Sequence, residues 1–210
     1  MCIKSSATLG TGTLTVDKNG TLSGVTASNS KLTNSSYSIS NGGTLRVGTT
    51  SSPTTGVMRF GGKSVSFASE SVLELGVAQA ATSSNTGGTS IQNISKLTMN
   101  GTIRMNVDPS AAENLAVGDS VVLWKDVASF EGTPKLESNI VDAVRCLVWD
   151  TTDLHKGILR IAYDNELSIS SEANDKINNP QTIYTLDGRH VKHPRKGQIN
   201  IVEGKKIYQK

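Results

Sequence analysis

GTLTV, residues 12–16, and GTLRV, residues 43–47, decide the fold, because the same short phrase returns along most of the chain. Each copy starts at a Gly or Ser and then places apolar side chains at alternate positions. An alternation with period two is typical of a short β-strand with one buried face. The clearest further copies are SVLEL (71–75), GTIRMNV (101–107) and GILRI (157–161). Weaker copies are GTLSGV (20–25), SKLTN (30–34), YSIS (37–40), KSVSF (63–67) and SKLTM (95–99).

The clear copies recur at about thirty residues, with the weaker copies between them, which is the behaviour of a solenoid. A single strand of this length buries too little apolar surface to be stable alone, whereas stacked coils bury a continuous column. Gly and Asn at the corners supply the positive φ that sharp bends require. The sequence therefore predicts an all-β protein, an elongated right-handed parallel β-helix.

The polar run TASNSKLTNSSYS (26–38) could be a disordered linker or part of a coil. Apolar residues at Val25, Leu32 and Ile39 favour a coil, with stacked Ser and Thr hydroxyls on its surface. The stretch VAQAATSSNTGGTSIQN (77–93) lacks such a pattern, and we expect it to protrude from the stack as a loop.

The pattern changes after about residue 108, where AAENLA (111–116) could form one helical turn. A strand SVVLWK (120–125) follows a Gly-Asp turn, and VRCLVWD (144–150) and ILRIAYD (158–164) are the arms of an expected hairpin. These longer, more apolar strands are typical of the antiparallel cap that covers the open end of a solenoid. We expect Trp124 and Trp149 to be buried in this cap.

Three parts follow from these patterns: a β-helix over 1–165 with its cap from about 108 to 165, a linker over 166–181, and a small β-tail over 182–210. The tail holds seven Lys or Arg residues against Asp187 and Glu203 and accounts for the net charge of +3. The rest of the chain is near neutral, which argues against a nucleic-acid-binding protein. The basic residues of the tail also lack the interleaved aromatic residues of a nucleic-acid site.

The sequence has no stretch of about 18 apolar residues, so it predicts no membrane helix. The basic stretch in the tail would be too weak a membrane anchor alone. The start, MCIKSSATLG, has no hydrophobic region of a signal peptide. The protein is therefore either cytoplasmic or an exported chain whose signal peptide has been removed or lost. Cys2 and Cys146 show no metal-binding spacing, and either a disulfide or two free thiols remains open.

The body, residues 10–165, resembles the β-helix repeats of bacterial autotransporter passengers and related adhesin-like surface proteins. The residues that carry the resemblance are the repeated G-T-L-x-V strands, the pair KLTMNGTIRMNV, and the phrases A-V-G-D-S-V-V-L-W and F-E-G-T. This resemblance implies a non-catalytic, secreted or surface-displayed stalk, or the C-terminal part of a larger exported protein, which could contact surface glycans or host ligands.

The tail resembles the C-terminal sorting domains of cargo of the type IX secretion system of Gram-negative bacteria. It departs from that pattern at Asn200, where an aromatic residue is common, and at Gln198, which lengthens the spacing. The resemblance implies that outer-membrane secretion machinery reads the tail; a plain structural tail with protective edge lysines is the alternative. The matching residues are Tyr184, Leu186, Gly188, Arg189, Val191, Gly197, Ile199, Ile201, Val202, Gly204, Lys205 and Lys206.

The sequence contains no nucleophile–base pair, phosphate-binding loop or CxxC motif, and we predict no catalytic, cofactor or metal site. His155, His190 and His193 fall in predicted turns or links, and no zinc spacing includes them, so surface histidines are expected.

Glu70 and Glu74 flank a strand, and Arg46 and Arg104 occupy equivalent positions on other coils. If the coils stack, these side chains would form a shallow polar strip on the outer face. Two other functions remain open: a carbohydrate-active β-helix enzyme, which needs paired carboxylates or Ca²⁺ ligands in a groove, and a glycan-binding module, which exposed aromatic residues would favour.

Overall fold

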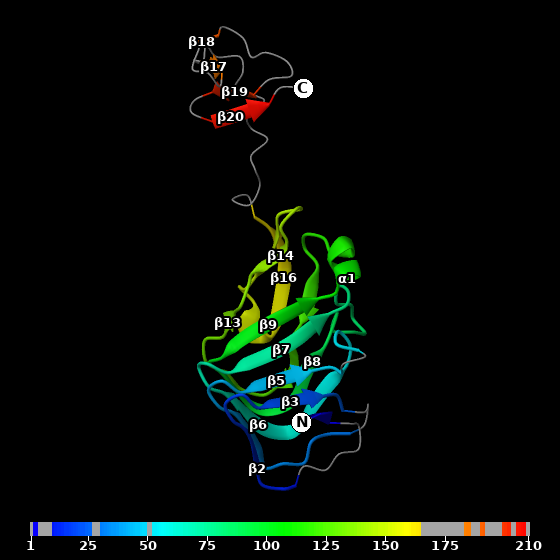
Figure 1. Cartoon of the computed structure of the whole chain (residues 1–210). Coiled ribbons are helices and arrows are strands. Elements are labelled where there is room, and N and C mark those ends of the chain that lie inside the picture. Colours follow the sequence, from blue (N-terminus) through cyan, green and yellow to red (C-terminus); the bar gives the residue numbers. More distant parts are fainter. Residues whose placement is uncertain are drawn as a thin grey trace. The chain divides into compact units, whose positions relative to one another are not determined.

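The computed structural model describes residues 2–3, 10–26, 30–49, 52–164, 183–185, 190–191, 199–202 and 205–208. The chain divides into two compact units, Met1–Leu167 and Ser168–Lys210. The first unit is a parallel β-helix with an antiparallel sheet at the C-terminal end, and the second holds a small antiparallel sheet (Figure 1). The prediction of an all-β solenoid with a cap and a β-tail is confirmed. In the part that the structure describes, no helix is long and apolar enough to cross a membrane.

Two parallel sheets form the β-helix, and successive strands of the coils alternate between them. Sheet A has the order β1 (Cys2–Ile3), β3 (Thr21–Gly24), β5 (Thr44–Val47), β7 (Val72–Val77), β9 (Thr102–Val107) and β13 (Lys135–Leu136). Sheet B has the order β2 (Thr13–Val16), β4 (Ser36–Ile39), β6 (Val57–Phe67) and β8 (Ser90–Met99), and both β11 (Trp124–Val127) and β12 (Phe130–Glu131) pair with β8.

The coils lengthen along the chain. Thr13 pairs with Ser36, Ser36 with Ser64 and Ser64 with Lys96, so successive repeats take 23, 28 and 32 residues. A spacing of about thirty residues therefore describes the later coils and overestimates the first. The extra residues extend sheet B, because β2 and β4 have 4 residues whereas β6 has 11.

A column of left-handed residues bends the long strands of sheet B. The backbone has φ of 62° at Gly61, 73° at Gly62, 57° at Asn93 and 55° at Asp126. Gly adopts this conformation freely and Asn and Asp tolerate it better than other residues, which explains the residue types at this corner. The bend divides sheet B into an upstream half, which comes before it, and a downstream half. In the upstream half, the sequence pattern predicted a strand only at residues 124–125 of β11 and missed the starts of β6 and β8.

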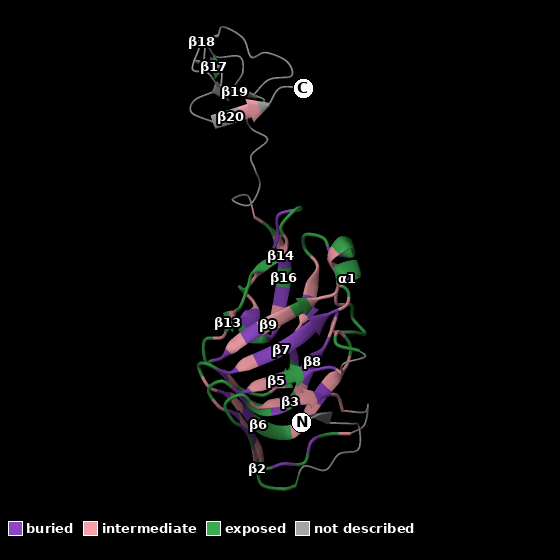
Figure 2. Cartoon of the chain, in the orientation of Figure 1, coloured by how far each residue is buried: buried purple, intermediate pink, exposed green. Residues whose placement is uncertain are grey.

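Buried residues recur on successive strands of the β-helix (Figure 2), and the strand register places apolar residues opposite one another. In sheet A, Leu22 pairs with Leu45, Leu45 with Leu73, and Leu73 with Ile103, and all four are buried. In sheet B the ring of Tyr37 meets that of Phe60 edge-on, with centroids 4.7 Å apart. Each buried side chain of this size contributes roughly 1.5–3 kcal/mol to the free energy of unfolding, so the columns hold the coils together.

The turn from sheet B to sheet A needs a residue without a side chain in most coils. A Cβ at Gly43 would lie 2.4 Å from the carbonyl oxygen of Val16, and a Cβ at Gly101 would lie 2.6 Å from that of Ser71. This close approach of one coil to the next explains the glycine that opens several of the repeated phrases.

Short polar side chains stack on the outer face of sheet B, as the sequence predicts for the hydroxyl-rich segments. Thr13 and Ser36 share a hydroxyl hydrogen bond of 2.8 Å. Ser38, Ser66 and Thr98 occupy successive positions of another row. Of the three apolar positions that favoured a coil, Leu32 and Ile39 are buried and Val25 is half-buried. The SKLTN segment does not form a strand, although the amide of Leu32 donates to the carbonyl of Arg59.

The expected loop is present over residues 78–88, and hydrogen bonds tie it to the cap. The amide of Ala81 donates to the carbonyl of Ser120 at 2.7 Å, and the amide of Val122 donates to that of Thr86 at 2.8 Å. These two bonds attach the loop to the cap. Residues 90–93, also expected in the loop, belong to β8.

The cap consists of helix α1 (Pro109–Asn114) and the antiparallel sheet β10 (Ser120–Val122), β16 (Ile158–Tyr163), β15 (Leu147–Asp150) and β14 (Ile140–Asp142). The predicted helical turn and hairpin are both present, and the short 3₁₀ helix η1 (Leu154–Lys156) lies in the hairpin connection. The expected strand 120–125 divides between the cap and sheet B. Because β11, β12 and β13 continue the parallel sheets, the last coil lies within the range 108–165 that the sequence assigned to the cap.

The second unit contains a four-stranded antiparallel sheet in the order β18 (His190–Val191), β17 (Ile183–Thr185), β19 (Ile199–Val202) and β20 (Lys205–Tyr208). The sequence predicted three of these strands, and the short strand β18 is the additional one. The expected linker over 166–181 lies outside the described residues.

Candidate functional site

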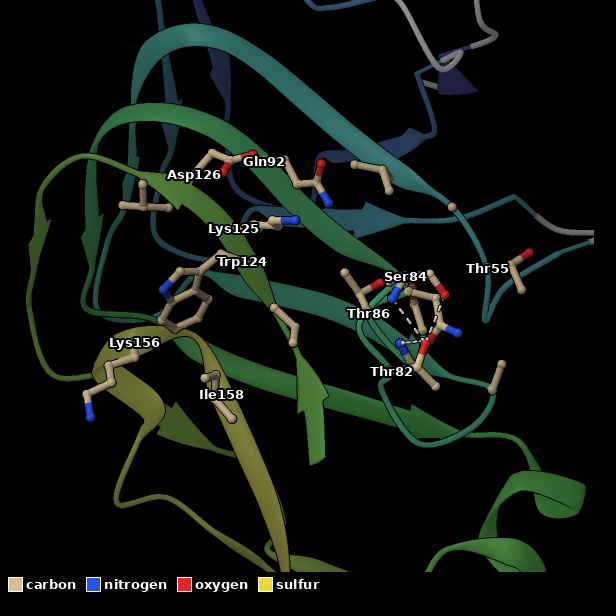
Figure 3. A pocket seen from close by; sticks show the side chains of 18 of the residues that line it. Thr55, Thr82, Ser84, Thr86, Gln92, Trp124, Lys125, Asp126, Lys156 and Ile158 are labelled. Atoms are coloured by element: carbon tan, nitrogen blue, oxygen red, sulfur yellow. Dashed lines mark hydrogen bonds between the residues drawn. The ribbon is translucent and has the colours of Figure 1, made fainter. Parts of the chain in front are cut away.

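A groove of about 910 Å³ lies where the last coils of the β-helix meet the cap (Figure 3). Its floor is formed by the upstream half of sheet B, one wall by the loop over 78–88, and the rim by η1 and the start of β16. The sequence analysis did not identify this groove, because its residues come from segments that are distant in the chain.

The floor of the groove carries a row of outward-pointing polar residues in register. Arg59 of β6 pairs with Gln92 of β8, and Gln92 pairs with Lys125 of β11. Adjacent strands lie about 4.8 Å apart, so the row offers donors and acceptors at a regular spacing. The Nε2 atom of Gln92 donates to the hydroxyl of Ser90 at 3.1 Å, which fixes the amide.

The loop wall is held in one conformation by its own hydrogen bonds. The amide of Gly87 donates to the side-chain oxygen of Asn85 at 2.9 Å, and the hydroxyl of Thr86 donates to the carbonyl of Gly88 at 2.8 Å. The hydroxyls of Thr82 and Ser84 lie 3.1 Å apart. Together with its attachment to the cap, this network holds the polar wall in a defined conformation.

Trp124 lies at the base of the groove but offers no open ring face. Trp124 is only 3% exposed, and its ring stacks on that of Phe130 with centroids 5.4 Å apart. Gly157 packs closely against the same ring, since a Cβ built on Gly157 would lie 2.5 Å from it. Trp149 is equally buried. Both tryptophans are buried as predicted, but Trp124 lies in β11 of sheet B and not in the cap sheet, where Trp149 lies. Neither ring is open for stacking on a sugar or base.

An ion-pair cluster forms the rim next to η1. Asp153 contacts the ammonium of Lys156 at 2.8 Å and the guanidinium of Arg160 at 3.2 Å. Two hydrogen bonds hold the pKa of Asp153 below its ordinary value: the one from Lys156 has the larger effect and the one from Arg160 the smaller. His155 is exposed at the same rim, consistent with the expected surface histidine.

The predicted polar strip forms on the outer face of sheet A. Arg46, Glu74 and Arg104 stand in register on β5, β7 and β9. Glu74 accepts a 2.9 Å hydrogen bond from Arg46 and a 2.8 Å hydrogen bond from Asn106. Arg104 in turn forms an ion pair with Glu137, which raises the pKa of Arg104 above its ordinary value. Glu70 is not part of the strip, because it lies in the turn before β7.

Both polar and apolar side chains line the groove. Among the described residues that line the groove, Asp126 is the one carboxylate. Within the described residues, no three His, Cys, Asp or Glu side chains come close enough to hold a metal ion. Cys146 is a buried free thiol, and the side chain of Cys2 lies outside the description.

The structure describes part of the predicted sorting motif. Tyr184 lies in β17 and is 40% exposed, beside the buried Ile183. The backbones of Val191, Ile199, Ile201, Val202, Lys205 and Lys206 lie in strands of the same sheet. Leu186, Gly188, Arg189, Gly197 and Gly204 lie outside the described residues, as do Asp187 and His193.

Comparisons of the chain with protein-family models, with curated proteins and with solved structures found no match.

Proposed function

We propose that this chain is a non-catalytic, adhesin-like module of a secreted or cell-surface protein, in which the β-helix is a rigid scaffold and the groove binds a saccharide. The observation that carries the proposal is the groove itself, with a polar wall held in a defined conformation facing an in-register polar floor. Hydroxyls, amides and a few charges suit a hydroxyl-rich ligand, because each can exchange a hydrogen bond with it.

The composition of the groove supports binding rather than cleavage. Glycoside hydrolysis ordinarily uses two carboxylates flanking the scissile bond. Asp126 lines the groove alone, and the nearby Asp153 is occupied by Lys156 and Arg160. The carboxylates of the outer strip, Glu74 and Glu137, are paired with arginines on sheet A and do not line the groove.

An array of immobilised neutral and acidic oligosaccharides tests this function. The labelled full chain is compared with Ser84→Trp, which places a large side chain at the groove, and with Ser69→Trp, a matched change at an exposed turn outside it. We expect the wild type and Ser69→Trp to bind the same saccharides and Ser84→Trp to lose them. No retention on any saccharide, or equal retention of both variants, would refute binding in the groove.

The tail, residues 182–210, is proposed to direct export through type IX secretion, on the strength of its sequence resemblance. Fused to a reporter that carries a signal peptide, it should deliver the reporter to the surface of a host with the type IX machinery and leave it in the periplasm of a host without it. A reporter that stays in the periplasm of both hosts would make the tail structural only.

A further inference from the structure

We propose that the groove selects saccharides that carry a carboxylate, such as uronic acids, and that Lys125 recognises this charge. The inference deepens the proposed function and rests on it. It names the class of ligand from the charges and hydrogen-bonding groups of the groove.

The charge of the groove favours an anion. Arg59, Lys125 and Lys156 line it, against the single carboxylate of Asp126. Lys156 is engaged by Asp153 at 2.8 Å, whereas Lys125 forms no ion pair with any residue that the structure describes. Figure 3 shows the Lys125 ammonium pointing toward the amide of Gln92, along the floor of the groove. An exposed lysine placed in this way leaves its charge available to a ligand in the groove.

Neutral groups around Lys125 complete a pattern that matches an acidic sugar. Because Nε2 of Gln92 donates to Ser90, the amide oxygen of Gln92 is held as an acceptor for a ligand hydroxyl. The hydroxyls of Thr82 and Ser84 face the groove from the loop wall. A uronic acid presents a carboxylate beside hydroxyl groups, so one residue of such a chain can meet the ammonium, the amide oxygen and the loop together.

The burial of the Trp124 ring makes the charge of the groove more important. Neutral saccharides and single-stranded nucleic acids commonly gain affinity by stacking on exposed rings. Trp124 is buried between Phe130 and Gly157 and cannot supply such a platform. Apolar lining residues such as Phe130 and Ile158 can add contact area. The ammonium of Lys125 can add a charge-assisted hydrogen bond, which is stronger than a neutral one.

Calorimetric titration of the full chain with tetragalacturonate and with its fully methyl-esterified form tests the inference, because esterification removes every negative charge and otherwise adds only methyl groups. We expect the acid to bind about tenfold or more tightly than the ester, a ratio typical of one charge-assisted hydrogen bond. Binding of the acid should also weaken at high salt, since the lysine is exposed.

Three variants assign the effect to Lys125. Lys125→Gln should lose about tenfold in affinity for the acid and nothing for the ester, and Lys125→Arg should retain most of the affinity. Lys135→Gln, a matched change of an exposed lysine on β13 outside the groove, should have no effect. Asp126→Asn should increase affinity for the acid, because it removes a like charge and Asn tolerates the positive φ of this position.

The outcomes separate the inference from the proposed function. Equal affinities for acid and ester would overturn acid selection while leaving a saccharide-binding groove in place. Binding of neither probe, together with an array that retains no saccharide, would overturn both. Displacement of tetragalacturonate by a single-stranded oligonucleotide at lower concentration would also overturn the inference, since the groove would then prefer a different polyanion.

Discussion

Arg46 and Glu74 stand side by side on β5 and β7, with Nη2 of Arg46 2.9 Å from Oε2 of Glu74. The side chain of Glu74 is 11% exposed and that of Arg46 is 50% exposed, so the pair is only partly shielded from water. A partly exposed pair of this kind contributes to register more than to total stability, because it fixes which residues of neighbouring coils lie opposite each other.

A double-mutant cycle with Arg46→Ala, Glu74→Ala and the double variant measures this contribution. We expect a coupling of about 1 kcal/mol in the free energy of unfolding, which is the upper end for surface pairs. Urea unfolding followed by circular dichroism gives the four values. Strict additivity of the two single changes would show that the ion pair contributes no coupling free energy to stability.

The core of stacked leucines predicts a large effect of Leu73→Ala. Leu73 is fully buried between Leu45 and Ile103, so its truncation removes apolar contacts with two coils and leaves a cavity. We expect the free energy of unfolding to fall by about 2–5 kcal/mol. Val117→Ala is the control, because Val117 is 59% exposed and its truncation should change stability by less than about 0.5 kcal/mol. Equal effects of the two changes would be inconsistent with this core.

The glycine turns predict a contrast between two apparently similar substitutions. Gly43→Ala places a Cβ 2.4 Å from the carbonyl oxygen of Val16, whereas a Cβ at Gly12 has no atom within 4 Å. Because backbone cannot move aside easily, Gly43→Ala should destabilise the protein by about 1–3 kcal/mol. Gly12→Ala should be neutral or slightly stabilising, since it restricts the unfolded chain. Thermal unfolding of both variants decides the point, and a neutral Gly43→Ala would contradict the stacking of these turns.

The period-two pattern predicted most strands because each needs only local alternation to bury one face. It missed the upstream parts of β6 and β8 in sheet B. In β6, Val57–Phe60 precedes two glycines, and the bend at Gly61 and Gly62 is recognisable only when Asn93 and Asp126 are seen beside it in the structure. It predicted the arginine and glutamate strip because those residues occupy equivalent positions in repeats. The groove was not predictable in this way, because Gln92, Thr82 and Lys125 come together only through the winding of the coils.

Hydrogen-bonded aspartates of the cap predict a loss of stability in acid. The hydroxyl and amide of Thr152 hold the pKa of Asp150 below its ordinary value, and those of Ser110 do the same for Asp108. A carboxylate whose pKa is lower in the folded than in the unfolded state stabilises the fold above the unfolded value of about 3.9. That contribution disappears as the pH falls through the folded pKa.

Urea unfolding at a series of pH values from neutral to about pH 3 measures this dependence. Stability should be nearly constant at higher pH and fall below about pH 4, and Asp150→Asn should show a shallower fall. Superimposable profiles of wild type and Asp150→Asn would mean that this aspartate does not contribute.

The most direct test of the account is to incubate the full chain with tetragalacturonate, to measure binding by calorimetry, and to analyse the saccharide afterwards by mass spectrometry. The account predicts saturable binding that Lys125→Gln weakens, with the saccharide recovered intact. Shortened or unsaturated products that depend on the protein would contradict a non-catalytic groove, and an absence of binding to this or any other saccharide would contradict the groove as a glycan site.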